Sequence, residues 1–268
     1  MTLTTTFHSY LRRLARHWPP APLQPAYTLG AYRRIYLYHI RKTGGTSLIQ
    51  MFLRLSGADA GAAYRGMCAA PTRRHRIGDK WYVGWDVPRI EQGAYFFAFS
   101  HTPAHGLRLP PHTYTVTCLR DQIQRVLSHY HMLRGYLADH VDHPCLQAEG
   151  RWATRGLADF SRRVEREHLL NQLYMFSPGF HIDEALENLS RCSCVMLAEH
   201  FSQGVAAINR DLGLQLQPVH ERKGSVREEI PQDALDDLRE RLEPEYALLA
   251  QLEHHGIGCH PAAEAAAP

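Results

Sequence analysis

Lysine is scarce in this chain of 268 residues, which carries 30 basic side chains but only three lysines. An ammonium group is a compact, mobile point charge, whereas guanidinium is a rigid planar fork, so the two are not interchangeable. In a chain that uses arginine by default, lysine should persist only where an ammonium is needed. Lys42 and Lys223 lie in short glycine-containing segments, residues 39–47 and 221–225. We therefore expect these two segments to hold phosphate or sulfate.

Long apolar runs and paired cysteines are also missing. No run approaches the roughly 18–20 apolar residues that span a bilayer, and the N-terminus lacks the apolar core of a secretory signal. The six cysteines are scattered, without a Cys-x-x-Cys pair, and a chain of this length needs no disulfide framework. These features favour reduced thiols and a cytoplasmic location. A net charge of +3 with neutral histidines is too small to indicate bulk binding of nucleic acid.

The two ends of the chain differ in composition from the middle. Residues 1–30 are expected to form a basic extension, in which residues 10–18 are basic and amphipathic. This segment either contacts an anionic membrane surface weakly, which would make the protein peripheral to the membrane, or docks on the domain as a surface helix. Residues 259–268 are rich in alanine and proline and are expected to form a flexible tail. A single domain over residues 31–258 remains.

Strand and helix patterns alternate along this domain. Short apolar runs predict strands at 35–38, 94–99, 114–119 and 194–197, and apolar periodicity predicts helices to about 55, over 122–137, 157–175, 183–191, 202–212 and 231–255. Residues 57–93 have weak periodicity and are expected to be irregular, with one short strand at 81–83. The alternation predicts an α/β fold, a single domain with a central parallel sheet flanked by helices.

The segment His39-Ile-Arg-Lys-Thr-Gly-Gly-Thr-Ser47 follows the first predicted strand. A glycine pair between a strand and a helix is the layout of an anion cradle, because the backbone can approach a ligand closely and the helix start offers free N–H groups. Thr46 or Ser47 can cap that helix. In an ordinary nucleotide-binding loop the lysine follows the glycines, whereas Lys42 precedes them. A purely structural turn is the alternative.

A second basic site follows the strand at 114–119. Arg120 stands at the C-terminal end of that strand, where open α/β sheets place their ligands. Ser128 comes eight residues later, two turns into the next helix, so Arg120 and Ser128 can together hold a second phosphate. Arg125 either shares that face of the helix or packs against it.

These two segments together resemble a known family. Residues 39–47 look like the 5′-phosphosulfate loop, and residues 119–130 like the 3′-phosphate motif, of carbohydrate sulfotransferases related to the heparan-sulfate 2-O and 6-O enzymes. The resemblance covers most of residues 33–255 except about 57–93. It implies a P-loop-like sulfotransferase fold and 3′-phosphoadenosine 5′-phosphosulfate (PAPS) as sulfuryl donor, with no metal required. Arg41 and Gln122 stand where the family usually has proline, which reduces loop rigidity.

The resemblance also assigns roles to individual residues. It implies that Lys42 acts on the leaving-group oxygen and that His101, which follows the strand at 94–99, accepts the proton of the attacking hydroxyl. We expect an ordinary pKa for this imidazole. His105 is the rival base, and Pro103 argues against a metal site that pairs the two histidines. The residues implied in donor binding are Arg41, Lys42, Thr43, Gly44, Gly45, Thr46, Ser47, Arg120, Ser128, Arg222, Lys223, Gly224 and Ser225, although 222–225 can also be an exposed basic turn.

The acceptor is expected to be a hydroxyl of a saccharide or glycolipid. Candidate contacts lie in the irregular segment, where Arg73, Arg74 and Arg76 could bind an anionic glycan and Trp81, Tyr82 and Trp85 could stack on sugars or form a small core. The arginine- and alanine-rich composition suggests a bacterial cytosolic enzyme. Four alternatives stay open: a nucleotide kinase or hydrolase with a variant phosphate loop, a small-metabolite sulfotransferase, a tyrosylprotein sulfotransferase, and a non-catalytic binding module.

Overall fold

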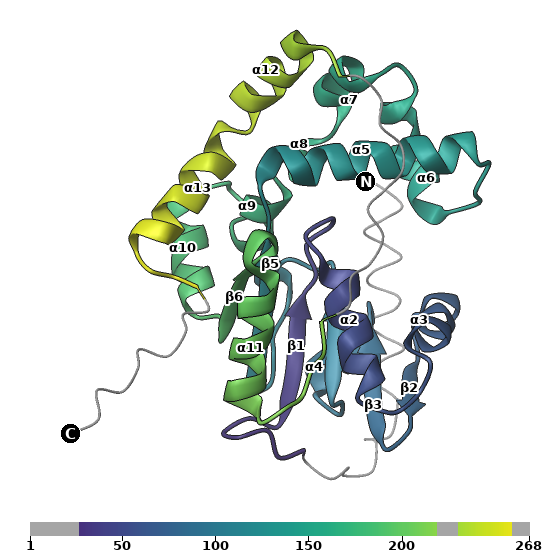
Figure 1. Cartoon of the computed structure of the whole chain (residues 1–268), viewed down its shortest axis with the longest axis vertical. Helices are drawn as coiled ribbons and strands as arrows, with labels where there is room; N and C mark the ends of the chain where they lie inside the picture. The colour runs from purple at the N-terminus through teal and green to yellow at the C-terminus, as the bar shows by residue number, and fades with distance from the viewer. Residues whose placement is uncertain (1–26, 219–229, 259–268) are drawn as a thin grey trace, which may run out of the picture.

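A central sheet of six strands organises the molecule, in a computed structural model that describes residues 27–218 and 230–258 (Figure 1). The strand order is β2-β3-β4-β1-β5-β6. The strands are β1 (Arg34–Tyr38), β2 (Arg74–Ile77), β3 (Lys80–Gly84), β4 (Phe97–Ser100), β5 (Thr113–Leu119) and β6 (Cys194–Leu197). All neighbours pair in parallel except β2, which is antiparallel to β3 at the edge. The predicted α/β architecture is therefore confirmed.

Helices cover both faces of this sheet. One face carries α2 (Gly45–Arg54), α3 (Ala60–Ala69) and α11 (Phe201–Leu212), which pack on inward side chains such as Leu37 and Val116. The opposite face carries α4 (Val87–Gln92), α5 (Gln122–Ala138), α9 (Asn171–Phe176), α10 (Ile182–Ser190) and α13 (Glu243–His254). Outside these lie α6 (Pro144–Glu149), η3 (Gly150–Ala153), α7 (Leu157–Arg163), α8 (Arg166–Leu169) and α12 (Gln232–Arg241), while η2 (Ala104–Gly106) and η4 (Ala198–His200) are single turns.

The middle of the sheet contains a topological switch point. Strands β1 and β5 are parallel neighbours, yet the helix that follows β1 covers one face and the helix that follows β5 covers the other. Figure 1 shows α2 and α11 in front of the sheet and α5 crossing beyond the strand ends. Two chain segments that part in this way leave a crevice outside the carboxyl ends of the strands, which is where open α/β sheets bind ligands.

Several local predictions were wrong. Residues 57–93 are not irregular, because they form α3, the hairpin of β2 and β3, and α4. The helix expected over 157–175 is divided into α7, α8 and α9, and α6 with η3 was not expected. The cap of α2 is Gly44, in a left-handed conformation, and not Thr46 or Ser47. The remaining predicted strands and helices are present, with ends shifted by a few residues.

Two predictions concern the environment of the chain. Within the described residues, no helix combines the length and the apolar character needed to cross a membrane. Cys68, Cys118, Cys145 and Cys192 are free thiols, whereas Cys194 is disulfide-bonded, so the expectation of reduced thiols is wrong for Cys194. The predictions on residues 10–18, 222–225 and 259–268 lie outside the described residues.

Candidate functional site

The loop after β1 presents backbone N–H groups at the switch point. Residues 41–44 form a turn, and α2 begins at Gly45. The first intrahelical bond is donated by Leu48 to the Gly44 carbonyl, over 3.3 Å, so the N–H groups of the preceding three residues have no carbonyl within the helix. Free N–H groups and the positive end of a helix dipole favour a negatively charged ligand at such a position. Thr43 is buried, and its hydroxyl donates to the Ile40 carbonyl over 3.1 Å, which closes the turn from inside.

Lys42 is held in a strained conformation within this turn. Its φ is +68°, in the left-handed region, where a residue with a side chain pays about 1–2 kcal/mol. The Arg120 guanidinium donates to the Lys42 carbonyl over 3.1 Å, which joins the two sequence motifs across the switch point. Burial, and secondarily the charge of Arg120, lowers the pKa of the Lys42 ammonium. The ammonium therefore gives up a proton more readily than an exposed lysine does.

Arg120 itself is fixed by a pair of backbone hydrogen bonds. Its N–H donates to the Gln172 side-chain oxygen over 2.7 Å, and the Gln172 amide donates back to the Arg120 carbonyl over 3.0 Å. The fully buried Glu245 carboxylate in turn accepts from the Gln172 backbone N–H over 2.7 Å and from its amide over 3.1 Å. A chain of contacts from α13 through α9 thus places Arg120 at the end of β5.

The residues that follow Arg120 do not all lie at the predicted phosphate site. Asp121 caps α5 by accepting from the Gln124 N–H over 2.8 Å. Arg125 is fully buried and donates to the carbonyls of His168 and Leu169. Of the two alternatives for Arg125, it therefore packs against the phosphate-binding face and does not share it. Ser128 is half-buried on α5 and does not line the crevice described next.

A crevice of about 480 Å³ opens where the two motifs meet. Its lining combines the loop, Arg120 and the start of α11, and consists of Thr43, Gly44, Ser47, Arg120, Ala198, Glu199, His200, Phe201, Ser202, Gln203 and Pro218. Four of the residues implied in donor binding therefore share one cavity. The side chains of Lys42 and His101 lie outside it.

His101 follows β4 and faces the root of the loop. Its Nδ1 lies 2.5 Å from the His39 carbonyl oxygen, and since a carbonyl only accepts, Nδ1 must carry the proton. The lone pair is then on Nε2, as a general base requires. Burial, followed by the charge of Arg41, lowers the pKa of His101 to about 4. The expectation of an ordinary pKa is therefore wrong, and the ring is neutral at pH 7.

The His39 ring packs against the His101 ring. The two rings have centroids 4.5 Å apart, and a Cβ placed on Gly45 would lie 2.1 Å from His39 Cδ2. Glycine at this position is therefore required by the close approach of the ring to the helix start. Burial lowers the pKa of His39 well below its ordinary value, so this ring is also neutral.

Arg41 does not reach the crevice. Its guanidinium forms an ion pair with Glu149 of α6, and its backbone N–H donates to the Asn171 side-chain oxygen over 3.4 Å. Glu149 was not predicted as a site residue, because a single glutamate outside any motif carries no local signal. Its pairing with Arg41 spans 108 positions of the chain.

The expected acceptor contacts are mostly structural. Tyr82 is buried, and Trp85 packs edge-on against Phe99 with ring centroids 4.8 Å apart, so both belong to the core. Arg74 lies 4.2 Å over the Trp81 ring on the edge hairpin. Of the six side chains proposed as acceptor contacts, Arg73 and Arg76 are exposed and available to an anionic glycan.

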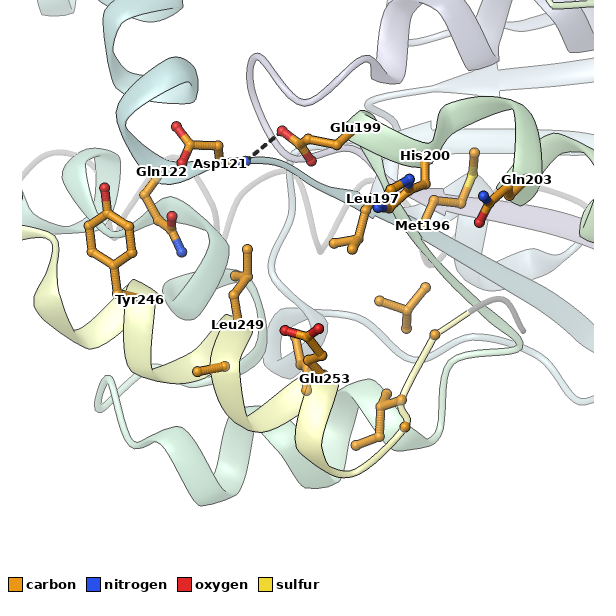
Figure 2. Close-up of a pocket in the computed structure, with 17 residues that line it drawn as sticks. Asp121, Gln122, Met196, Leu197, Glu199, His200, Gln203, Tyr246, Leu249 and Glu253 are labelled. Carbon is orange, nitrogen blue, oxygen red and sulfur yellow. Dashed lines mark hydrogen bonds between the residues drawn. The ribbon is translucent and has the colours of Figure 1, made fainter. Parts of the chain in front are cut away.

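A second and larger cavity, of about 620 Å³, lies on the other side of η4 (Figure 2). Leu197 and Met196 face Leu249 and Glu253 of α13 across it. It shares Glu199, His200 and Gln203 with the crevice but includes none of the residues selected from the sequence. Of the two cavities, the crevice is the one that the loop and Arg120 line together.

Comparisons with known proteins add no assignment. No protein-family model matches this chain. No curated protein matches it significantly either. Within residues 27–218 and 230–258, no group of three or more histidine, cysteine, aspartate or glutamate side chains is arranged to hold a metal ion.

Proposed function

We propose that this protein is a sulfotransferase that moves the sulfuryl group of PAPS to a hydroxyl of an acceptor, with a P-loop-like sulfotransferase fold. The observation that carries the proposal is the meeting of the loop at 41–47 with Arg120, whose guanidinium donates to the Lys42 carbonyl at the switch point. The two basic motifs follow the carboxyl ends of two neighbouring parallel strands. Such an arrangement suits a nucleotide with phosphate groups at both its 3′ and 5′ positions.

The proposed donor site uses the crevice and its rim. The free N–H groups at the start of α2, with the hydroxyls of Thr46 and Ser47, would bind the 5′-phosphate. Arg120, with Ser128, would bind the 3′-phosphate. The crevice volume of about 480 Å³ lies in the range of about 300–1,000 Å³ that small-molecule sites occupy. Arg222, Lys223, Gly224 and Ser225 stay part of this proposal.

The proposed chemistry is one in-line displacement. The acceptor oxygen attacks sulfur while its proton passes to Nε2 of His101, and the bond from sulfur to the bridging oxygen breaks as adenosine 3′,5′-bisphosphate leaves. A neutral imidazole with its Nδ1–H held by the His39 carbonyl suits this role. Lys42, whose pKa burial lowers, would stabilise the negative charge on the leaving oxygen.

The acceptor in this proposal is a hydroxyl of a saccharide or glycolipid. The experiment is incubation of the purified protein with PAPS labelled in its sulfuryl group and a panel of neutral and acidic glycans, with tyrosine peptides and small phenols in parallel. We expect label on a glycan, and a loss of about 10²–10⁴-fold in rate for His101→Gln, the usual range for general acid–base catalysis. Failure to label any hydroxyl compound would refute the proposal. Transfer from γ-labelled ATP would support a kinase instead.

A further inference from the structure

The loop at 41–44 contains no proline, and yet it holds Lys42 in a left-handed conformation. Such a residue keeps its conformation only when its surroundings fix it from several sides. One side-chain hydrogen bond stabilises the loop from within, from the Thr43 hydroxyl to the Ile40 carbonyl. The restraints that come from outside the loop are therefore what hold it.

Two outside restraints are visible: the bond from Arg120 to the Lys42 carbonyl, and an ion pair at Arg41. The Arg41 guanidinium contacts the Glu149 carboxylate, whose side chain is only 3% exposed, while that of Arg41 is 29% exposed. A carboxylate buried to this degree is stable only when it is paired, and an arginine fork is well suited to pair with it. The Asn171 side chain adds a second contact, to the Arg41 backbone N–H.

Glu149 is itself held in place from two further helices. Its other oxygen lies 2.7 Å from Nε2 of the buried His129 on α5, and His168 of α8 lies 3.9 Å away. The hydrogen bond from His129 and the charge of Arg41 hold the pKa of Glu149 at about 2, against the opposing effect of burial. The carboxylate is therefore charged at every pH at which the protein would work.

We propose that Glu149 is a positioning residue that clamps Arg41, and through it the loop at 41–47, in the conformation that binds the donor. The inference rests on the proposed function, because it concerns the geometry of that donor site. Glu149 contacts no reacting group in this scheme, and it acts through Arg41 on the neighbouring Lys42. Residues of α5, α6 and α8 would thereby restrain the loop from outside.

The charges of Arg41 and Glu149 also affect the pKa of His101. The charged and titratable groups near this ring are Arg41 of the loop, Glu149 of α6, His168 of α8 and His39 at the end of β1. Arg41 and His168 lower the pKa of His101, and Glu149 raises it. Removing either member of the ion pair should therefore shift this pKa in opposite directions, which loss of packing alone would not do.

The test uses Glu149→Gln and Arg41→Gln in the full chain, with Glu187→Gln as a control. Glu187 belongs to an exposed ion pair with Arg191 on α10, so its loss should change nothing at the site. We expect amide exchange of Arg41 and Leu48, whose N–H groups donate to Asn171 and Gly44 at the two ends of the loop, to accelerate at least tenfold in both test variants. Adenosine 3′,5′-bisphosphate should bind about tenfold more weakly. NMR titration should show the pKa of His101 lowered in Glu149→Gln and raised in Arg41→Gln.

Unchanged loop exchange and unchanged His101 titration in folded variants would overturn the clamp. Arg41→Gln alters a partly exposed side chain, so it provides the same readouts if Glu149→Gln does not fold. Exchange and titration need no ligand, and they therefore judge the clamp even if the wild-type protein fails to bind the bisphosphate. That failure would refute the proposed function instead.

Discussion

Replacing Gly45 by alanine should destabilise the protein, although alanine is the better helix former. A Cβ at this position would lie 2.1 Å from Cδ2 and 2.5 Å from Nε2 of His39. The His39 ring is buried and is in contact with the His101 and Phe99 rings, so it cannot move away freely. Overpacking of this kind costs about 1–3 kcal/mol.

The opposing gain is small. Exchanging glycine for alanine within a helix contributes about 1 kcal/mol at most. We therefore expect Gly45→Ala to lower the free energy of unfolding by about 1–2 kcal/mol, which corresponds to a fall in Tm of about 2–8 °C for a domain of this size. Because the His39 ring packs against His101, the rate of the proposed sulfuryl transfer should fall as well.

Gly135→Ala in α5 is the matched control. A Cβ there meets nothing within 4 Å, and the residue lies inside a helix, so the same exchange should stabilise by about 0.5–1 kcal/mol. Urea unfolding of the two variants and the wild type measures the difference. A Gly45→Ala protein as stable as the wild type would refute the claim that the close approach of His39 requires glycine.

Three further predictions concern buried charge. Because burial lowers the pKa values of His39, His101 and His129, unfolding takes up protons below about pH 6.5, so urea unfolding should show stability falling as the pH drops from 6.5 to 4, and a flat profile would contradict this. If His101 is the base, kcat/KM should stay level from pH 8 down to about 5.5 and decline only near pH 4, where the ring is protonated, and an acid limb near 6.5 would exclude it. Glu245→Ala leaves Arg125 buried without its ion-pair partner, so it should cost about 3–5 kcal/mol in a urea titration, and a loss under 1 kcal/mol would contradict the network.

The sequence predicted the architecture because local patterns encode it. The strand at 35–38 is short, β-branched and aromatic, and the strand at 114–119 leads directly into a capped helix. The position of Arg120 at a strand end follows from that pattern together with the general behaviour of open sheets. The meeting of this residue with the loop needs only that β1 and β5 be neighbours.

The segment 57–93 was misread because its apolar periodicity is weak, although two helix starts are encoded there. Asp59 caps α3 by accepting from the Ala62 N–H, and Asp86 caps α4, where a proline follows in the first turn. Both capping residues are local signals for the start of a helix. The capping of α2 was misread for the opposite reason, since a hydroxyl residue was available but a left-handed glycine took the position.

Contacts between distant residues had no signal in a single sequence. The Arg41–Glu149 ion pair joins a loop to a helix that was not expected, and the bonds between Gln172 and Arg120 cross 52 positions. The low pKa of His101 depends on how deeply the ring is buried, which only the packing of the strand ends determines. These are properties of tertiary structure and not of local pattern.

Calorimetric titration of the metal-free protein with adenosine 3′,5′-bisphosphate, and with ATP for comparison, tests the central claim most directly. We expect the bisphosphate to bind with a Kd in the micromolar range or below, unchanged by Mg²⁺. Binding should be lost in Arg120→Ala and kept in the surface control Arg191→Ala. Binding of ATP but not of the bisphosphate would contradict the donor site and favour a nucleotide kinase.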